Sequence, residues 1–231
     1  TERKAGRIVC LFITALIWGF AFVAQSEGNV MGPLTFNGLR NLLGFAALLP
    51  FIRIYYKSFS LDRDTLMGGI CCGICLFLAS NTQQYALLYT TPGKTGFITA
   101  CYMIFVPIAG LLSGRRIGPR TAFAIVLSAA GLYLLCIPEG QGFGGVNRGD
   151  LLALLCAVFY TMHILCIDHF TVRAEGIKMS CIQFLVCGIL TIIPAFLLED
   201  QEAAALRSGL LPLLYAGIMS SGVAYSMQIV G

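Results

Sequence analysis

The sequence predicts an all-α integral membrane protein, a helical bundle of two inverted five-helix repeats of which the second is incomplete. Three observations support this expectation: the composition, the length of the uncharged apolar runs, and an internal repeat. The chain is 58% hydrophobic and 11% charged, with a mean hydropathy of +0.84, whereas a soluble domain is roughly 25% charged. A soluble fold of 231 residues has no core large enough to bury that much apolar surface, so the solvent is lipid.

Eight apolar runs are each about as long as a bilayer core requires, which is ~20 residues per helix. Because these runs are continuous rather than alternating, helices are favoured over a β-barrel. The first run follows Arg3, Lys4 and Arg7, but it extends as far as a full span and no Ala-x-Ala site follows it, which argues against a signal peptide. The expected spans are 8–25, 34–52, 66–88, 95–113, 121–137, 151–167, 179–198 and 209–230.

The distribution of Lys and Arg predicts the orientation of these spans, because cytoplasmic loops carry the excess of positive charge. With the amino terminus in the cytoplasm, only Lys94, Arg148 and Arg207 lie on the far side. We therefore expect a multi-pass protein of the inner (plasma) membrane with a cytoplasmic amino terminus. The net charge of +4 reflects this topology, and no nucleic-acid partner is expected. The cytoplasmic set is Arg3, Lys4, Arg7, Arg53, Lys57, Arg63, Arg115, Arg116, Arg120, Arg173 and Lys178.

An internal repeat is visible at an offset of 144 residues, where Gly44 aligns with Gly188, Pro50 with Pro194, Gly73 with Gly217 and Gln84 with Gln228. Five spans fall within one repeat, and an odd number of spans inserts the second copy upside down. We expect the first repeat at 1–140 and a partial second repeat at 141–231. Since span five ends near 137, its partner should end near 281 (137 plus 144), so the sequence reads as part of a ten-span protein.

Several spans carry polar or aromatic side chains at helical spacing, which places each set on one face. Buried amides cost several kcal/mol when unpaired, so these faces should turn away from lipid. One interpretation is a shared, partly hydrated cavity near the midplane; the alternative is interhelical hydrogen bonding that only holds the bundle together. The candidate substrate-binding residues are Trp18, Phe22, Gln25, Arg40, Asn81, Gln84, Tyr85, Thr99, Tyr102, Tyr160, His163, Tyr225 and Gln228.

Two of these residues carry or can acquire charge. Arg40 follows Leu34 by six residues, about 9 Å along a helix, and it can attract an anionic group, snorkel to the interface or bind helix-end carbonyls. His163 is the intramembrane group that titrates near neutral pH, so it is the candidate for proton coupling, although a lone histidine can equally be a packing residue. Pro107 is expected to kink the fourth span.

Short motifs follow one another in a fixed order along essentially the whole chain. They are Trp18-Gly19 with Phe22; Pro33, Phe36 and Arg40; Tyr85-Ala86-Leu87 followed by Thr90, Thr91 and Gly93; Pro107; Gly131-Leu132 with Leu134-Leu135; and Gly149-Asp150. In order and spacing they resemble the ten-span EamA-type branch of the drug/metabolite transporter superfamily. Members of that branch commonly have Gly-Glu after the fourth span, where this chain has Gly114-Arg115, so no role is carried over for that acid.

The resemblance implies two five-helix inverted repeats around a central cavity that opens alternately to the two sides of the membrane. It further implies a secondary carrier, usually in a bacterial inner membrane, that moves amino acids, other metabolites or drugs, often outward. In the family the cavity is formed by spans one, three, four, six, eight and nine.

Three classes of function can be compared on the sequence. A secondary transporter, expected to be an exporter, needs a lipid bilayer, a small-molecule substrate and, in the candidate coupling scheme, a proton. A membrane-embedded enzyme needs clustered acids, histidines or a nucleophile–base pair, and a passive channel needs a repeated pore ring or filter. The sequence offers neither pattern, so we expect no catalytic residues, no metal and no cofactor.

Overall fold

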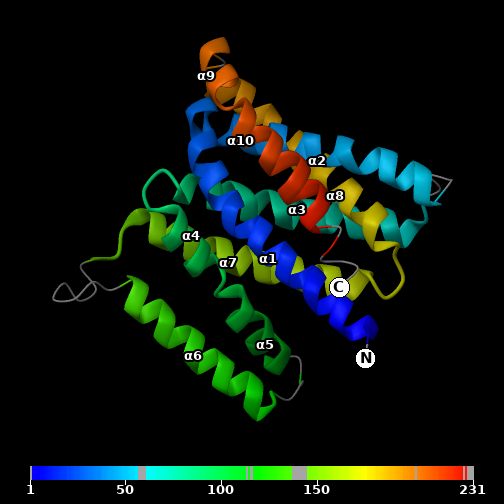
Figure 1. The fold of residues 1–231 in the computed structure, drawn as a ribbon, viewed down its shortest axis with the longest axis vertical. Helices are drawn as coiled ribbons and strands as arrows, with labels where there is room; N and C mark the ends of the chain where they lie inside the picture. Colours follow the sequence, from blue (N-terminus) through cyan, green and yellow to red (C-terminus); the bar gives the residue numbers. More distant parts are fainter. Residues whose placement is uncertain are drawn as a thin grey trace.

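The computed structural model describes residues 2–56, 61–112, 114, 117–136, 145–200, 202–225 and 227, and all regular structure within them is helical (Figure 1). Five helical stretches are long and apolar enough to cross a membrane, and a shorter apolar stretch follows at Leu210–Ala224. The protein is therefore an integral membrane helical bundle, as the sequence predicts. The five stretches are Ile8–Met31, Arg63–Ala86, Pro92–Leu111, Arg148–Phe170 and Gly176–Leu198.

The helices occur where the apolar runs predict them. The long ones are α1 (Glu2–Gly28), α2 (Pro33–Tyr56), α3 (Arg63–Ala86), α6 (Pro119–Cys136), α7 (Arg148–Phe170) and α8 (Gly176–Leu198). The fourth expected span is divided into α4 (Pro92–Thr99) and α5 (Tyr102–Leu112). The short elements are the 3₁₀ turn η1 (Asn29–Met31), α9 (Ala203–Ser208), α10 (Leu210–Leu214) and the π-helix η3 (Tyr215–Ala224).

The division of the fourth span does not occur at the proline, and the expected kink at Pro107 stays a prediction. Pro107 lies inside α5, and the interruption is at Ala100 and Cys101. There the backbone changes to the tighter i→i−3 pattern: the Cys101 N–H bonds the Ile98 carbonyl at 3.0 Å and the Met103 N–H bonds the Ala100 carbonyl at 3.0 Å. Such a 3₁₀ segment redirects a helix without a proline.

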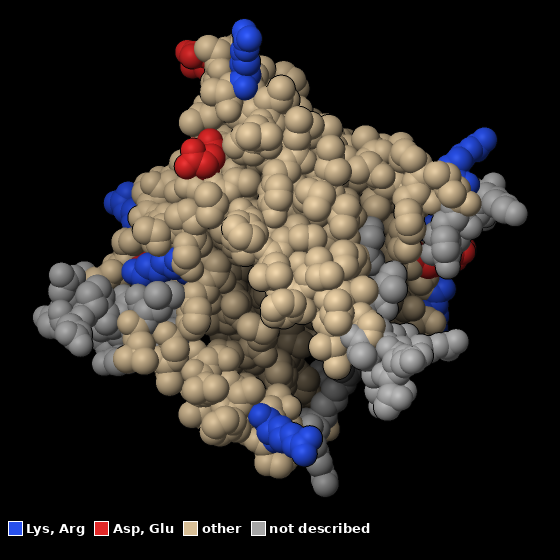
Figure 2. Space-filling view, in the orientation of Figure 1, with Lys and Arg blue, Asp and Glu red and all other residues tan. Residues whose placement is uncertain are grey.

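The centre of the bundle is formed by α2, α3, α7, α8 and η3, with α1 packed along η3. In Figure 1, α5 and α6 lie at the edge of this group, and α6 contacts α4 and α5. Charged side chains gather at the ends of the molecule in the space-filling view, leaving wide uncharged faces between them (Figure 2). This distribution is the one that a lipid environment requires.

Glycines allow the central helices to cross closely. A Cβ added at Gly73 of α3 would lie 2.7 Å from the Val186 Cβ of α8, and one at Gly44 of α2 would lie 2.7 Å from the Ser221 Cβ of η3. Small residues at helix crossings are typical of membrane bundles, because association there depends on close packing rather than on the hydrophobic effect. The crossings that position the central side chains are therefore fixed by backbone proximity.

The amino-terminal end of α2 is held by a carboxylate from the far end of α8. Glu199 accepts hydrogen bonds from the Leu34 N–H at 2.8 Å, from the Thr35 N–H at 2.7 Å and from the Thr35 hydroxyl at 2.7 Å. A negative charge at this position satisfies orphan backbone donors and complements the helix dipole. This contact fixes the antiparallel register of α2 and α8.

Candidate functional site

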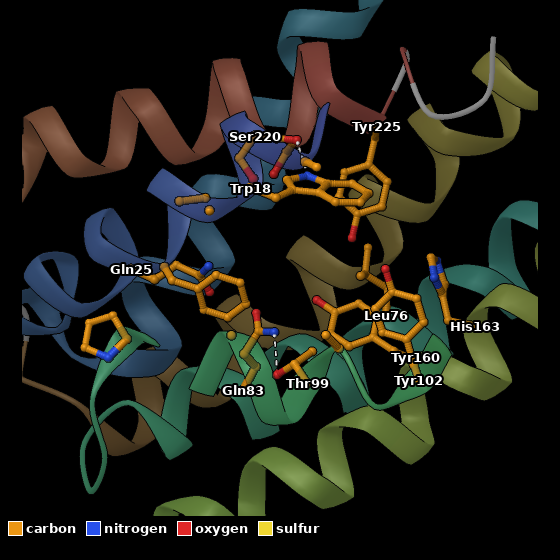
Figure 3. A pocket seen from close by; sticks show the side chains of 18 of the residues that line it. Trp18, Gln25, Leu76, Gln83, Thr99, Tyr102, Tyr160, His163, Ser220 and Tyr225 are labelled. Atoms are coloured by element: carbon orange, nitrogen blue, oxygen red, sulfur yellow. Dashed lines mark hydrogen bonds between the residues drawn. The ribbon is translucent and has the colours of Figure 1, made fainter. Parts of the chain in front are cut away.

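A cavity of about 560 Å³ lies at the centre of the bundle and is bounded by α1, α2, α3, α4, α5, α7, α8 and η3 (Figure 3). Its volume falls within the range of small-molecule pockets, and its walls are mainly apolar and aromatic with a few polar groups. Nine of the thirteen candidate residues predicted from the sequence line it: Trp18, Phe22, Gln25, Arg40, Thr99, Tyr102, Tyr160, His163 and Tyr225.

One wall is an aromatic cluster around Tyr225. The Trp18 ring meets Tyr225 edge-on at 5.1 Å between centroids, and Phe184 meets it at 5.1 Å and 88°. The Trp18 indole N–H donates to the Ser220 carbonyl at 3.4 Å, which orients the ring from α1 across to η3. Figure 3 shows Trp18 and Tyr225 together on one side of the open space.

The facing wall comes from α5 and α7. Tyr102 and Tyr160 lie 6.2 Å apart between ring centroids, and Tyr160 meets the His163 ring edge-on at 6.2 Å. His163 in turn lies 6.5 Å from Tyr225 of the first wall. Because edge-to-face pairs of this kind orient neighbouring rings, the two walls form a continuous aromatic lining.

His163 has one ring nitrogen paired and the other unpaired. Its Nε2 lies 2.9 Å from the Gln183 Oε1 of α8, so the Nε2–H tautomer can donate to that amide. Its Nδ1 is buried and has no hydrogen-bond partner. The residue lines the cavity, and in the Nε2–H tautomer its Nδ1 carries the free lone pair.

Arg40 is 6% exposed and lines the cavity. Its Nε is buried without a hydrogen-bond partner, and no described carboxylate or carbonyl bonds its guanidinium. The sequence leaves three alternatives open for Arg40. Snorkelling requires an exposed guanidinium, and binding of helix-end carbonyls requires a guanidinium that is hydrogen-bonded to a carbonyl oxygen. Neither matches this geometry.

Three other candidate residues do not line the cavity. Asn81 accepts from the Asn37 Nδ2 at 2.9 Å and donates to the Thr191 hydroxyl at 2.9 Å, joining α2, α3 and α8. Gln84 donates from Nε2 to the Gln25 carbonyl at 2.8 Å and to the Asn29 Oδ1 at 2.8 Å, joining α3 to the end of α1. For these two amides the geometry matches the interhelical alternative.

Tyr85 is partly exposed on α3, away from the cavity lining. The last candidate, Gln228, lies outside the described residues.

The structure also brings polar residues to the cavity that the sequence interpretation omitted, including Gln83, Asn41 and Ser220. Gln83 donates from Nε2 to the Thr99 hydroxyl at 3.3 Å (Figure 3). It directly precedes Gln84, and adjacent helical residues point about 100° apart. A helical wheel that considered both Gln83 and Gln84 could have identified Gln83 as a candidate. The sequence does not say which helices pack against each face of α3.

No group of three or more His, Cys, Asp and Glu side chains within the described ranges is arranged to hold a metal ion. The lining offers hydrogen-bonding, aromatic and cationic groups instead. The arrangement is therefore one for binding and orienting a small molecule.

Comparisons with known proteins agree with this arrangement. A solved structure titled only "Crystal structure of protein" superimposes with a TM-score of 0.72 at 20% identity, covering 98% of this chain and 79% of that one, which supports the fold alone. Two proteins of Archaeoglobus fulgidus, each named "Uncharacterized transporter", are similar in sequence. One is 32% identical over 78% of this chain and 55% of its own length, and the other 22% identical over 79% and 66%.

The chain thus spans between about half and two thirds of these curated relatives. The model of the EamA-like transporter family matches residues 6–137 and again residues 147–231. Together these matches cover most of the chain. The protein is a multi-pass membrane protein and belongs to the EamA-like transporter family.

Proposed function

We propose that this chain binds and translocates the substrate of a secondary transporter of small metabolites, namely amino acids, related solutes or drugs, and that it works as an exporter by alternating access. The observation that carries the proposal is the cavity itself. Helices from both ends of the sequence enclose it, from Trp18 on α1 to Tyr225 after η3. Binding sites at the interface of two repeats are the arrangement that alternating access requires.

The helix pairing supports two inverted repeats with the boundaries 1–140 and 141–231. If α1, α2 and α3 are matched to α7, α8 and α10–η3, then swapping the two halves converts each helix pair between them into another observed pair or into itself. The antiparallel pair of α1 with η3 corresponds to that of α7 with α3, and the parallel pair of α2 with η3 corresponds to that of α8 with α3. The antiparallel pair of α2 with α8 corresponds to itself, as a two-fold axis demands.

The glycine contacts repeat at the same offset. A Cβ on Gly73 would meet the Val186 Cβ at 2.7 Å and the Gln183 carbonyl at 3.1 Å, whereas one on Gly217 would meet the Leu43 Cβ at 2.6 Å and the Arg40 carbonyl at 3.2 Å. In each case the contacts are a side chain and the carbonyl three residues before it. This correspondence, at the 144-residue offset for the glycines, supports rocking of two equivalent halves about the cavity.

Contacts at each end of the bundle join the two halves. At the end assigned to the cytoplasm, the Glu175 N–H donates to the Thr65 hydroxyl at 3.1 Å, joining the start of α8 to that of α3. At the other end, Lys94 at the start of α4 pairs with Asp150 at the start of α7, with 2.6 Å between Nζ and Oδ2. This pair ties an element from each half and is a candidate gate that must open when the cavity faces outward.

A proton is the candidate coupling ion, and His163 is its candidate site. The His163 ring lies beside Tyr160 and Tyr225 and its Nδ1 has no partner, and protonation there would change the charge of the cavity wall. A lone imidazole that only packed against Gln183 would leave flux independent of the proton gradient. His163→Gln should therefore lower the stimulation of flux by a pH gradient.

Reconstitution into liposomes tests the proposed function. A carrier shows saturable flux and counterflow for some members of a panel of radiolabelled amino acids and hydrophobic carboxylates, a channel shows no counterflow, and an enzyme consumes its substrate. Tyr160→Leu should reduce flux at least ~tenfold while leaving expression unchanged, because the ring forms the cavity wall. Phe123→Leu is the matched control, since Phe123 is 70% exposed on α6. Flux without counterflow, or equal loss in both variants, would reject the carrier.

A further inference from the structure

We propose that Arg40 binds a single carboxylate, so that the substrate is a monoanion with a largely apolar or aromatic body. This inference rests on the proposed function and specifies its substrate class. The guanidinium is the one permanent charge among the cavity-lining residues that the structure describes. Every other group in that lining is neutral or, for His163, titratable.

Arg40 is buried as a cation in a membrane interior, which is costly unless a partner compensates the charge. The described acidic side chains are engaged elsewhere or lie at the ends of the bundle: Asp150 pairs with Lys94, Glu175 pairs with Lys178, and Glu199 caps α2. None of them reaches Arg40. Among the described residues no carboxylate compensates Arg40, and a molecule that enters the cavity could supply the anion.

The backbone that carries Arg40 is closely packed. The Arg40 carbonyl lies 3.2 Å from the position that a Cβ on Gly217 would occupy, so α2 and η3 cross with almost no space between them. Tyr160 and Tyr225 line the same cavity as Arg40. A phenol that reached a carboxylate on Arg40 would donate a hydrogen bond to it and add direction to the charge pairing.

The charge count favours a carboxylate over a phosphate. One Arg neutralises one carboxylate, whereas a phosphate monoester carries about −1.5 to −2 charges at neutral pH and would leave part of its charge unpaired. The remaining walls are Trp18, Phe22, Phe184 and the tyrosines, which suit an apolar or aromatic body. The volume of about 560 Å³ admits a molecule of metabolite size.

The protein carries its own reporter for the test, because Trp18 is its single tryptophan and lies in the cavity wall. Tryptophan emission, excited at a wavelength that spares tyrosine, can follow titration with 3-phenylpropionate, with its neutral amide 3-phenylpropionamide and with phenethyl phosphate. We expect the carboxylate to bind at least ~tenfold more tightly than the amide, the range of a charge-assisted hydrogen bond, and more tightly than the phosphate.

Three variants separate the charge from its surroundings. Arg40→Gln should bring the carboxylate-to-amide ratio to within ~threefold of one, Arg40→Lys should keep much of the preference, and the matched control Arg53→Gln, at an exposed site near the end of α2, should leave it unchanged. Equal binding of acid and amide by the unaltered protein, tighter binding of the phosphate, or no binding of the carboxylate would overturn the inference even if a variant fails to fold. A preference retained in Arg40→Gln would overturn it too.

Liposome counterflow distinguishes this inference from the proposed function. Flux of neutral solutes without any carboxylate preference would leave the transporter intact and remove the anion site. Carboxylate preference that depends on Arg40, without flux of any solute, would leave the anion site intact and remove the carrier.

Discussion

Substitution of two adjacent glutamines on α3 should distinguish a residue that stabilises the helix bundle from a residue that binds the substrate. Gln84 is fully buried and donates two hydrogen bonds of 2.8 Å to α1 and η1, whereas Gln83 lines the cavity. We expect Gln84→Leu to destabilise the protein with little effect on binding, and Gln83→Leu to weaken binding with little effect on stability. Each substitution is the matched control of the other, since both place the same side chain in the same helical turn.

The magnitude for Gln84→Leu follows from its contacts. Removal of the amide leaves the Gln25 carbonyl and the Asn29 Oδ1 without this donor, which costs ~1–3 kcal/mol per buried acceptor in water-soluble proteins and averages ~0.6 kcal/mol per hydrogen bond in a membrane bundle. The Gln84 Oε1 has no partner, so its removal returns part of that cost. We expect a net loss of ~1–2 kcal/mol in the free energy of unfolding, or ~2–8 °C in Tm for a chain of this size.

Thermal unfolding in detergent measures this loss, and titration of the Trp18 emission measures binding in the same samples. The affinity of Gln84→Leu should stay within ~threefold of the unaltered protein, and that of Gln83→Leu should fall by more. A Gln84→Leu protein with unchanged Tm and a tenfold weaker affinity would refute the division between the two amides.

Three further predictions concern the frame around the cavity. Gly73→Ala should destabilise by ~1–3 kcal/mol because the added Cβ meets an α8 side chain at 2.7 Å, whereas Gly19→Ala, with nothing within 4 Å, should not; Tm measurement checks both. Glu199→Gln should lower Tm by a few degrees, since it removes the charge at the start of α2, and the effect should shrink at high salt. At the start of α3, hydrogen bonds from Thr65 lower the pKa of Asp62. Its stabilising effect is therefore present above the unfolded-state pKa, near 3.9, and is lost as pH falls through the folded value, so the difference in Tm between Asp62→Ala and the unaltered protein should narrow in acid.

The positions of the helices could be predicted from the sequence, because in lipid the length of an apolar run decides where a helix lies. The internal geometry of two spans could not. Hydropathy does not distinguish backbone bonds to residue i−4 from the i−3 bonds at Cys101 or from the π-helix at Tyr215–Ala224. Both irregular segments border the cavity, where helix irregularities are frequent at functional sites.

The site was predictable as a set of helices and less so as a set of residues. Aromatic side chains such as Trp18 and Tyr225 point inward, since each has neighbours at helical spacing that mark the same face. The positions of the amides of α3 were harder to predict, because Asn81 and Gln84 belong to the face that contacts α2 and α1. Which face of α3 lines the cavity depends on how the neighbouring helices pack against it. Spacing within one helix carries no information about its rotation against the others.

Buried polar groups differ in how completely they are hydrogen-bonded, both in the cavity wall and outside it, where the Gln84 Oε1 is also unpartnered. Asn81 and Gln25 are both buried amides, but the Asn81 oxygen is paired with Asn37, whereas the Gln25 Oε1 in the cavity wall has no partner. The same holds for the Arg40 Nε and the His163 Nδ1. Lipid cannot satisfy such atoms, and each costs free energy for as long as the cavity holds nothing that bonds to it. Three of them belong to residues that line the cavity, and the carboxylate titration measures whether an anionic molecule binds there.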